Sequence, residues 1–263
     1  MSKSIIENLF DSVACQYAEN SCSYFQYFGK RLVDQAKVSL GENVLDVATG
    51  KGAVLFPLAD VVGCKGKVTG IDISGEMIKE TSDLVKEKNL NKVNLQQMDA
   101  ENLLFPENTF DFVFCGFALF FFPSLSKALS EFRKVLKPKG KFAFSIWKEK
   151  PSLSSFVRGE IENLKFSTNL TSYLYKKEEL YSFLNKSGFN NIEIFEEAKE
   201  FYHETPDKWW NSLWTHGTKL MLENLSQKQL DIIHEKALKR ANSLLSSKGV
   251  IETFDVYYGF GEK

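Results

Sequence analysis

Two glycines that follow an apolar stretch are the residues best placed to cradle a ligand. Gly50 and Gly52 come directly after the apolar run from Val44 to Ala48, and a helical pattern resumes at Leu55. Glycine can adopt positive φ in a tight turn, and it has no Cβ to block a ligand lying against the backbone. A strand, a glycine turn and a helix in this order predict a ligand cradle.

Asp72 is placed to bind the sugar of such a ligand. It ends a second strand, 67–72, and a carboxylate at this point of a strand–helix–strand unit can accept hydrogen bonds from a ribose diol. The dinucleotide-binding fingerprint needs a third small residue three positions after the second glycine, where this chain has Leu55. We therefore expect a nucleoside without phosphates rather than a nicotinamide or flavin dinucleotide.

Five short motifs follow one another between residues 44 and 141. They are Val44–Gly52, Gly70–Ser74, Gln97–Glu101, Phe110–Phe117 and Val135–Lys141. In sequence, order and spacing they resemble the motifs of class I S-adenosylmethionine-dependent methyltransferases, and in particular the ubiquinone/menaquinone-methyltransferase-like group. The resemblance covers about residues 7–147. It implies S-adenosyl-L-methionine as cofactor and specifies the methyl acceptor far less well.

The resemblance also implies a set of cofactor contacts. In chain order these are Tyr17, Ala48, Thr49, Gly50, Asp72, Ile73, Met77, Asp99, Ala100, Cys115 and Phe117. The backbone of residues 48–50, with Asp46, would shape the methionine pocket, and Asp72 would bind the ribose hydroxyls. Ile73 and Met77 would flank the adenine, and Asp99 with Ala100 would receive its edge. Three alternatives stay open: Tyr17 as a core aromatic, Asp72 as a helix cap and Asp99 as a turn residue.

The acceptor side is marked by aromatic residues rather than by a histidine pair. Where many relatives carry two histidines after the fourth strand, this chain has Ala118 to Pro123, so a base or metal ligand is missing there. Phe117 and Phe120 could line an apolar acceptor pocket or simply pack the start of a helix.

The remaining candidates lie near the C-terminal end. His216 is the candidate catalytic base, with a structural histidine as the alternative. Trp209 and Trp214 are the candidate substrate contacts in the same segment. No histidines and carboxylates fall at metal-ligand spacing, so we expect no metal.

Strands and helices alternate along the segment that must position these residues. The expected strands are 43–48, 67–73, 92–98, 110–116, 141–147, 191–195 and 253–260, and helices at 55–62, 75–88, 124–137 and 176–187 separate several of them. Such alternation predicts an α/β fold, a doubly wound and mostly parallel Rossmann-like sheet that binds ligands beyond the carboxyl ends of its strands. The resemblance implies seven strands with the last one antiparallel.

We expect one methyltransferase domain over residues 1–263. N-terminal helices would occupy 1–40, and the Rossmann-like core would comprise 41–198 and 251–263. A helical cap, 199–250, would be inserted between strands six and seven. Connections of this length are usually functional, and lids are a common case. The alternatives are a peripheral helix bundle or a dimer surface.

Composition limits the partners. A net charge of -1 gives no basic field for a nucleic acid, so a small-molecule substrate is expected. The most apolar stretch, 112–123, is too short to span a bilayer, and no signal peptide is recognisable, which together predict a cytoplasmic protein. The four cysteines, Cys15, Cys22, Cys64 and Cys115, are too dispersed for a zinc site or a disulfide framework. A homodimer stays open.

These features predict an S-adenosylmethionine-dependent methyltransferase that acts on a small aromatic or otherwise apolar metabolite. Such an enzyme mainly aligns donor and nucleophile and excludes water, and it needs a general base only when the acceptor is a poor nucleophile. The alternatives are a quinone-precursor C-methyltransferase and a non-catalytic S-adenosylmethionine-binding protein of the same fold.

Overall fold

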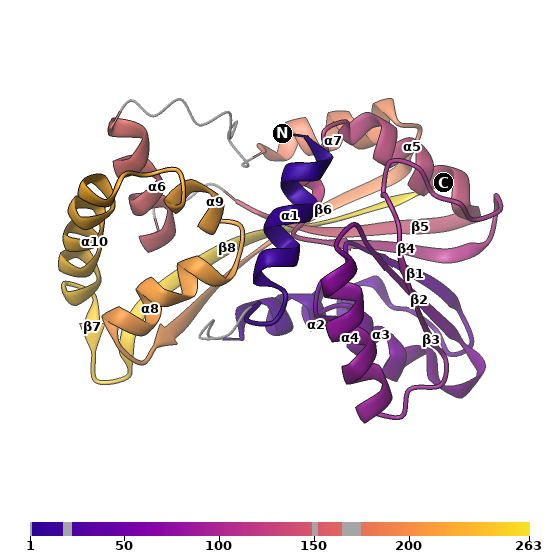
Figure 1. The fold of residues 1–263 in the computed structure, drawn as a ribbon. Coiled ribbons are helices and arrows are strands. Elements are labelled where there is room, and N and C mark those ends of the chain that lie inside the picture. The colour runs from indigo at the N-terminus through magenta and orange to yellow at the C-terminus, as the bar shows by residue number, and fades with distance from the viewer. Residues whose placement is uncertain (1, 18–22, 149–151, 165–174) are drawn as a thin grey trace.

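The computed structural model describes residues 2–17, 23–148, 152–164 and 175–263 (Figure 1). Its strands form one sheet in the order β3-β2-β1-β4-β5-β8-β6, and the short β7 pairs with β8. The strands are β1 (Asn43–Val47), β2 (Lys67–Asp72), β3 (Val93–Gln97), β4 (Phe110–Gly116), β5 (Leu136–Trp147), β6 (Asn190–His203), β7 (Leu245–Ser246) and β8 (Gly249–Glu262). Strands β1 to β5 are parallel, and β8 is antiparallel to both β5 and β6. The predicted mostly parallel sheet with an antiparallel last long strand is confirmed.

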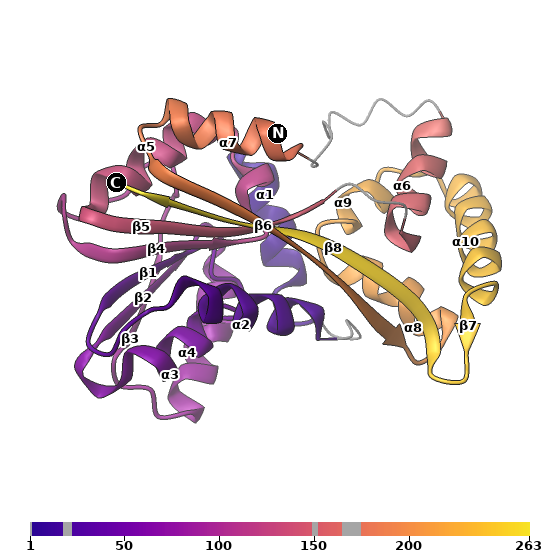
Figure 2. The ribbon, with the colours of Figure 1, turned by 180° about the vertical axis from the view of Figure 1, so that it is seen from behind.

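Helices cover both faces of this sheet. The core helices are α1 (Lys3–Val13), α2 (Tyr24–Ala36), α3 (Leu55–Val62), α4 (Gly75–Glu87), α5 (Leu125–Val135) and α7 (Lys177–Lys186). Helices α5 and α7 pack on one face, and α2 and α3 pack on the other (Figures 1 and 2). Strand β4 shows why the chain folds this way: Val113 and Cys115 face the first layer, while Phe112 and Phe114 face the second. A strand buried on both faces is apolar at nearly every position.

Three strands are longer than the sequence predicted. Strand β5 begins at Leu136 rather than at residue 141, so Pro138 and Gly140, which we would expect to close the preceding helix, lie inside the strand. The register shifts between Phe110 and Phe112 beside this stretch, and proline is tolerated at such an irregularity because no ladder donor is needed there. Strands β6 and β8 pair continuously from Glu193 with Phe260 to His203 with Val250.

The extra length of β6 and β8 carries a second lobe, which we call the cap. It contains α8 (Pro206–Ser212), the short helical turn η3 (Leu213–Thr215), α9 (Lys219–Leu222) and α10 (Gln227–Asn242). A similar short turn, η2 (Leu119–Phe121), belongs to the core. Helix α6 (Leu153–Asn163), from the segment predicted as core, also packs in this lobe against α10. Figure 2 shows β6 and β8 running through both lobes.

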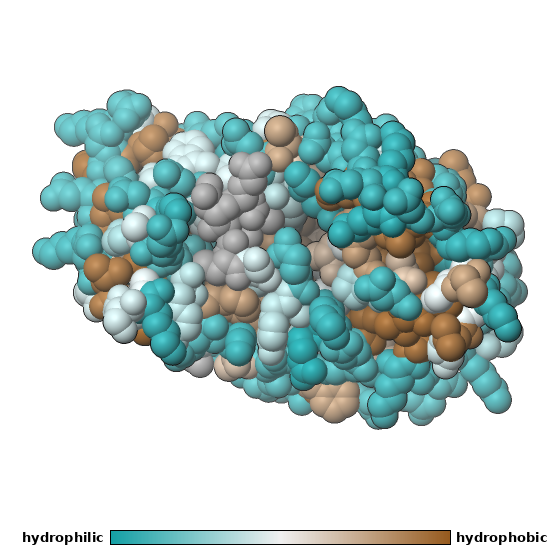
Figure 3. Space-filling model, turned by 90° about the horizontal axis from the view of Figure 1, so that it is seen from below, coloured by the Kyte–Doolittle hydropathy of each residue, from teal (hydrophilic) through white to brown (hydrophobic). Residues whose placement is uncertain are grey.

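The face of the molecule seen from below is mostly hydrophilic (Figure 3). Figure 3 shows hydrophilic side chains over most of the face seen from below, with larger apolar areas on the side of the core lobe. Within the four described ranges, no helix is both long enough and apolar enough to cross a membrane.

Candidate functional site

A pocket lies beyond the carboxyl ends of β1, β2 and β4, where parallel sheets bind ligands. We call it the strand-end pocket. Its lining includes most of the expected cofactor contacts: Tyr17, Ala48, Gly50, Asp72, Ile73, Met77, Asp99, Ala100 and Phe117. Helix α1 covers it with Lys3, Ile6 and Phe10, which the sequence reasoning did not identify.

The glycine turn forms the floor of this pocket. Gly50 and Gly52 have φ of 50° and 81°. Ala48 has φ of 55°, a backbone conformation that residues other than glycine rarely adopt. The amide of Thr49 donates to the carbonyl of Ile71 at 2.9 Å, which fixes the turn against β2. In this conformation Ala48 and Gly50 line the pocket, where a ligand can approach the backbone of the turn.

Asp72 connects the turn to the next helix. Its Oδ2 accepts from the Gly50 amide at 2.9 Å, and its Oδ1 accepts from the Ser74 amide at 3.0 Å. Burial raises the pKa of Asp72 to about 6, and the backbone amides of Ser74 and Gly50 oppose that rise. The side chain of Ser74, not Asp72, caps α4. Each carboxylate oxygen keeps a second lone pair that a ribose hydroxyl can use.

Asp46 presents an unsatisfied oxygen beside the turn. Its Oδ2 accepts from the Thr49 hydroxyl at 2.7 Å, but its Oδ1 has no hydrogen-bond partner among the described residues, although the side chain is 1% exposed. Burial raises the pKa of Asp46 to about 7. The carboxylate lines a recess that Tyr17 and Gly50 also line. A buried oxygen of this kind needs a donor, and the α-ammonium of a methionine moiety fits.

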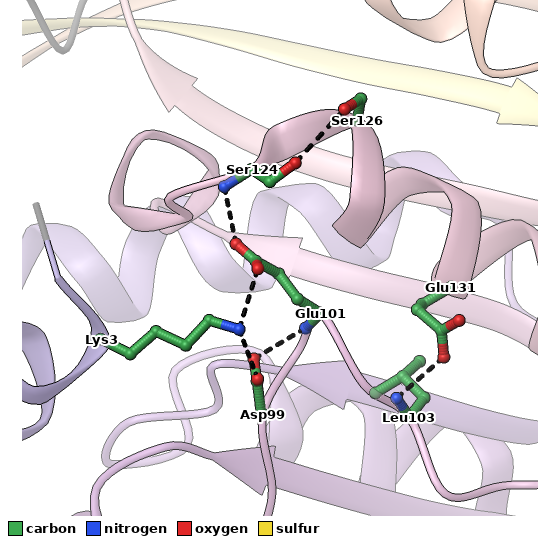
Figure 4. A network of polar contacts seen from close by, with 7 residues as sticks. All are labelled: Lys3, Asp99, Glu101, Leu103, Ser124, Ser126 and Glu131. Carbon is green, nitrogen blue, oxygen red and sulfur yellow. Dashed lines mark hydrogen bonds and ion pairs between the residues drawn. The ribbon is translucent and has the colours of Figure 1, made fainter.

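Asp99 lies at the opposite end of the strand-end pocket in a polar network (Figure 4). The Lys3 ammonium is 2.6 Å from Asp99 Oδ2 and 2.8 Å from Glu101 Oε2. The Glu101 amide donates to Asp99 Oδ1 at 2.9 Å, and the Ser124 amide donates to Glu101 Oε1 at 2.7 Å. Asp99, the residue expected at the adenine edge, is therefore held in place by Lys3 on α1 and by Glu101 in its own loop.

A second pocket lies between the core and the cap, and we call it the cap pocket. With the solvent at its mouth it occupies about 1040 Å³. Among the described residues, nine aromatic side chains line it: Phe10, Tyr17, Tyr24, Phe25, Phe117, Phe120, Phe121, Trp147 and Phe254. Polar residues from the end of β5, from α6 and from β8 line it too, namely Lys148, Ser152, Ser154, Ser155, Arg158, Thr253 and Asp255.

Four aromatic residues line both pockets: Phe10, Tyr17, Phe117 and Phe121. Phe117 has φ of 54° and stacks on Trp147, with 4.0 Å between the ring centroids. Burial raises the pKa of Tyr17, so its hydroxyl stays protonated in the neutral range. Groups held in the two pockets would therefore meet beside these four aromatic side chains. The tyrosine among them is uncharged there.

His216 lines the cap pocket, as expected of a residue near the acceptor. The Thr218 amide donates to His216 Nδ1 at 3.4 Å, which assigns the proton of the neutral ring to Nε2. Burial lowers the pKa of His216 to about 4. At neutral pH the imidazole is therefore uncharged and a weak base.

Three expected contacts lie elsewhere. Cys115 points into the core beneath α5, because side chains alternate along a strand, and its neighbour Gly116 lines the strand-end pocket instead. Trp209 is fully buried in the cap, where its Nε1 donates to Glu252 Oε2 at 3.2 Å. Trp214 packs against the same cap cluster and lines none of the three hollows. Both tryptophans hold the cap together.

Some residues of the site left little trace in the sequence. Trp147 ends an apolar strand on the ligand side of the sheet, and this position could have identified it. Arg158 on α6 and Lys3 on α1 carry no such signal. In the part of the chain that the structure describes, no cluster of side chains could hold a metal ion. Cys22 lies outside that part.

Comparisons with known proteins agree with this geometry. A family described as a methyltransferase domain matches residues 44–140. An aklanonic acid methyltransferase from Streptomyces sp. (strain C5) is 37% identical over 143 residues, which are 54% of this chain and 65% of that protein. A demethylmenaquinone methyltransferase from Staphylococcus carnosus (strain TM300) is 33% identical over 193 residues, which are 72% of this chain and 79% of that protein.

A solved structure shows the same fold. The crystal structure of a SAM-dependent methyltransferase from Aquifex aeolicus matches with a TM-score of 0.54 and 25% identity, over 76% of this chain and 93% of that one. The strand-end pocket, the sequence relatives and this structure lead to one conclusion. The chain belongs to the class I S-adenosylmethionine-dependent methyltransferases, and S-adenosylmethionine is its methyl donor.

Proposed function

We propose that the protein methylates a planar aromatic small molecule bound in the cap pocket. The observation that carries this proposal is the set of aromatic residues shared by the two pockets, with Tyr17 and Phe117 at their junction. Aromatic rings prefer offset-stacked or edge-to-face neighbours, and the Phe117–Trp147 pair offers such a surface. An acceptor ring on this surface would lie next to the strand-end pocket.

The residues of the strand-end pocket would hold the donor. We propose that Asp46 accepts from its ammonium group, Asp72 from its ribose hydroxyls and Asp99 from its adenine edge, with Ile73 and Met77 against the base. Bound S-adenosylmethionine supplies an activated methyl group, whose transfer breaks the carbon–sulfur bond and leaves S-adenosylhomocysteine. The protein then has to align the acceptor and exclude water, and for this α1 lines both pockets while the cap lines the cap pocket.

His216 would act as a hydrogen-bond donor to the acceptor rather than as a strong base. Its low pKa keeps it neutral, and its proton is on Nε2 because Nδ1 accepts from Thr218. A hydroxyl that ionises readily, or a carbon activated by such a hydroxyl, needs no strong base. We therefore propose a phenolic or enolic acceptor, with Phe120 as a further contact on the aromatic side.

A quinone precursor methylated on carbon is the second candidate. It is favoured by the match to a demethylmenaquinone methyltransferase, of which this chain covers 79%. The name of the aklanonic acid methyltransferase supports an organic acid as acceptor instead. A net charge of -1 supports small molecules over nucleic acids as partners. A homodimer and a cytoplasmic location stay predictions from the sequence.

The test is a methylation assay with matched acceptors. Purified protein and S-adenosylmethionine would be incubated with 1,4-naphthoquinol, with 2-naphthol and with a hydroxyanthraquinone carboxylate, and product mass and S-adenosylhomocysteine would be measured. We expect a mass gain of one methyl group on at least one aromatic acceptor, and its loss when Phe117→Ala opens the aromatic surface. Turnover only with non-aromatic acceptors such as ethanolamine phosphate would overturn the proposal.

A further inference from the structure

Helix α1 lines both pockets although it contributes no residue to the expected cofactor contacts. Lys3 and Ile6 line the strand-end pocket, and Phe10 lines both pockets. One surface of a single helix therefore reaches from the adenine end of the donor site to the acceptor site. Any displacement of α1 would open both pockets at once.

Lys3 provides the ionic contact at the start of this helix. It pairs with Asp99 at 2.6 Å and with Glu101 at 2.8 Å (Figure 4). Among the described residues that line the strand-end pocket it is the one cation, beside the carboxylates of Asp72, Asp99 and Glu101. The Glu101 side chain is 5% exposed, so loss of the ammonium would leave a nearly buried charge without its counter-ion.

The other end of α1 is tied to the start of α4. The Ser74 hydroxyl donates to Asp11 Oδ1 at 2.5 Å, and the Glu76 amide donates to the same oxygen at 3.2 Å. Ser74 and Glu76 lie in the segment just after Asp72 in the chain. Helix α1 is thus held at each end by segments that carry the proposed adenine and ribose contacts.

Phe10 transmits the position of α1 to the cap pocket. Its ring lies perpendicular to Phe121 with 5.0 Å between centroids, and 6.2 Å from the ring of Tyr17. Phe121 in turn contacts the cap, because a Cβ added to Gly217 would come within 2.9 Å of its ring. The Lys219 ammonium of the cap reaches Ser12 Oγ on the helix side at 3.0 Å.

We propose that Lys3 is a positioning residue that holds α1 closed over both pockets, so that donor and acceptor affinities depend on the same closed position. A ligand that binds only the closed form loses affinity in proportion to the closed population. Weakening the contact at Lys3 would therefore weaken binding in the cap pocket, which Lys3 does not line. Filling the strand-end pocket would restore it, since linkage between two sites is reciprocal.

The experiment compares Lys3→Met with the wild type and with Lys3→Arg. A matched control is Lys86→Met, which breaks an exposed ion pair with Asp83 on α4, away from both pockets. Calorimetry would give the affinity for S-adenosylhomocysteine, and quenching of tryptophan fluorescence would give the affinity for 2-naphthol with and without saturating S-adenosylhomocysteine. Circular dichroism would confirm that each variant is folded.

We expect Lys3→Met to weaken both ligands by about 5-fold or more, a typical size for coupling between sites. Saturating S-adenosylhomocysteine should return its 2-naphthol affinity to the wild-type value, and Lys3→Arg should retain most of both affinities. A variant that loses S-adenosylhomocysteine affinity while its 2-naphthol affinity is unchanged would assign Lys3 a purely local role and overturn the proposal. The proposal rests on the pocket assignment made under Proposed function, but both readouts are binding. Failure of every acceptor in the methylation assay would therefore be a separate result.

Discussion

Asp72 holds the surrounding backbone and lines the strand-end pocket, and a single substitution tests whether it also binds the donor. It holds the amides of Gly50 and Ser74, and it presents further lone pairs to the strand-end pocket. We expect Asp72→Ala to weaken S-adenosylhomocysteine binding by about 1–3 kcal/mol, the cost of losing hydrogen bonds to a charged group. Calorimetric titration would measure this, with exposed Asp83→Ala as control. Equal affinities in folded Asp72→Ala and wild type would remove Asp72 from the donor site.

With the proposed donor contacts, the two buried aspartates should make donor binding depend on pH. Asp46 and Asp72 have pKa values raised to about 7 and about 6, so each gains a proton as pH falls through these values. The ammonium and ribose hydroxyls of the donor prefer the ionised carboxylates, so S-adenosylhomocysteine should bind more tightly as pH rises from 5 to 8 and should release protons on binding. Calorimetry in buffers of different ionisation enthalpy would measure the release. An identical curve for Asp46→Asn would contradict the role of Asp46.

The same shifts act on stability in the opposite direction. A carboxyl whose pKa is higher in the folded protein than in the unfolded chain stabilises the fold at low pH, and this contribution is lost as pH rises through the folded value. For Asp46 and Asp72 that window runs from about pH 4 to pH 7. Because the donor binds more tightly when these carboxyls are ionised, S-adenosylhomocysteine should raise the melting temperature more at pH 7.5 than at pH 5. A gain independent of pH would contradict this account.

Most residues on the motifs were predictable, with Cys115 as an exception, and residues defined by distant partners were not. Gly50, Asp72 and Asp99 occupy the pocket as expected because strand ends and turns place them there. Trp209 was expected to contact the substrate but lies buried in the cap, where it bonds to Glu252, which follows it by 43 positions along the chain. Lys3 was missed because its two partners lie about a hundred positions away. Contacts of this kind leave no periodic signal in a sequence.

At the scale of elements, the cap is organised by one buried carboxylate. Glu252 on β8 accepts from Trp209 on α8, from Ser154 on α6 at 2.8 Å, and pairs with His203 on β6 at 3.1 Å. These bonds join α6, β6, α8 and β8, of which only β6 and α8 are neighbours in the chain. Hydrophobic side chains of α6, α8 and α10 then fill the interior of the lobe.

Substitution of Trp209 tests this organisation. Trp209→Ala should destabilise the protein by about 3–5 kcal/mol, as large-to-small changes in a core do, and Trp209→Phe should cost less. Urea denaturation would measure both, and S-adenosylhomocysteine affinity should stay close to that of the wild type. A raised acceptor KM at unchanged stability would instead restore Trp209 as a substrate contact.

The sequence predicted the elements of the core better than those of the cap. The bounds of α3, α4 and β4 agree with the expectation to within a residue, because glycine turns and apolar runs mark them. The lengths of β6 and β8 were underestimated, because their outer halves are stabilised by pairing with each other rather than by an apolar pattern. Helix α6 was not expected in the cap, because it packs there against α10, which lies far along the chain from it.

For the whole molecule, the lobes are joined by continuous strands whereas α1 lies over the pockets as a separate cover. Residues 190–203 and 249–262 form one antiparallel ladder that crosses from core to cap (Figure 2). We therefore expect S-adenosylhomocysteine to slow hydrogen exchange in α1 and the glycine turn while exchange in this ladder stays the same. Mass spectrometry of deuterium uptake would test this. Protection concentrated in the ladder would indicate that the lobes move instead.

The outermost position of β6 in the sheet has a consequence for the protein in concentrated solution. A strand of 14 residues at a sheet edge exposes unpaired amides and carbonyls that could recruit the same edge of another copy. Four glutamates and Lys199 stand on β6 between residues 193 and 200, and charged side chains on an edge strand oppose its pairing with a second copy. We therefore expect these charges to protect the protein against aggregation through its sheet in concentrated solution.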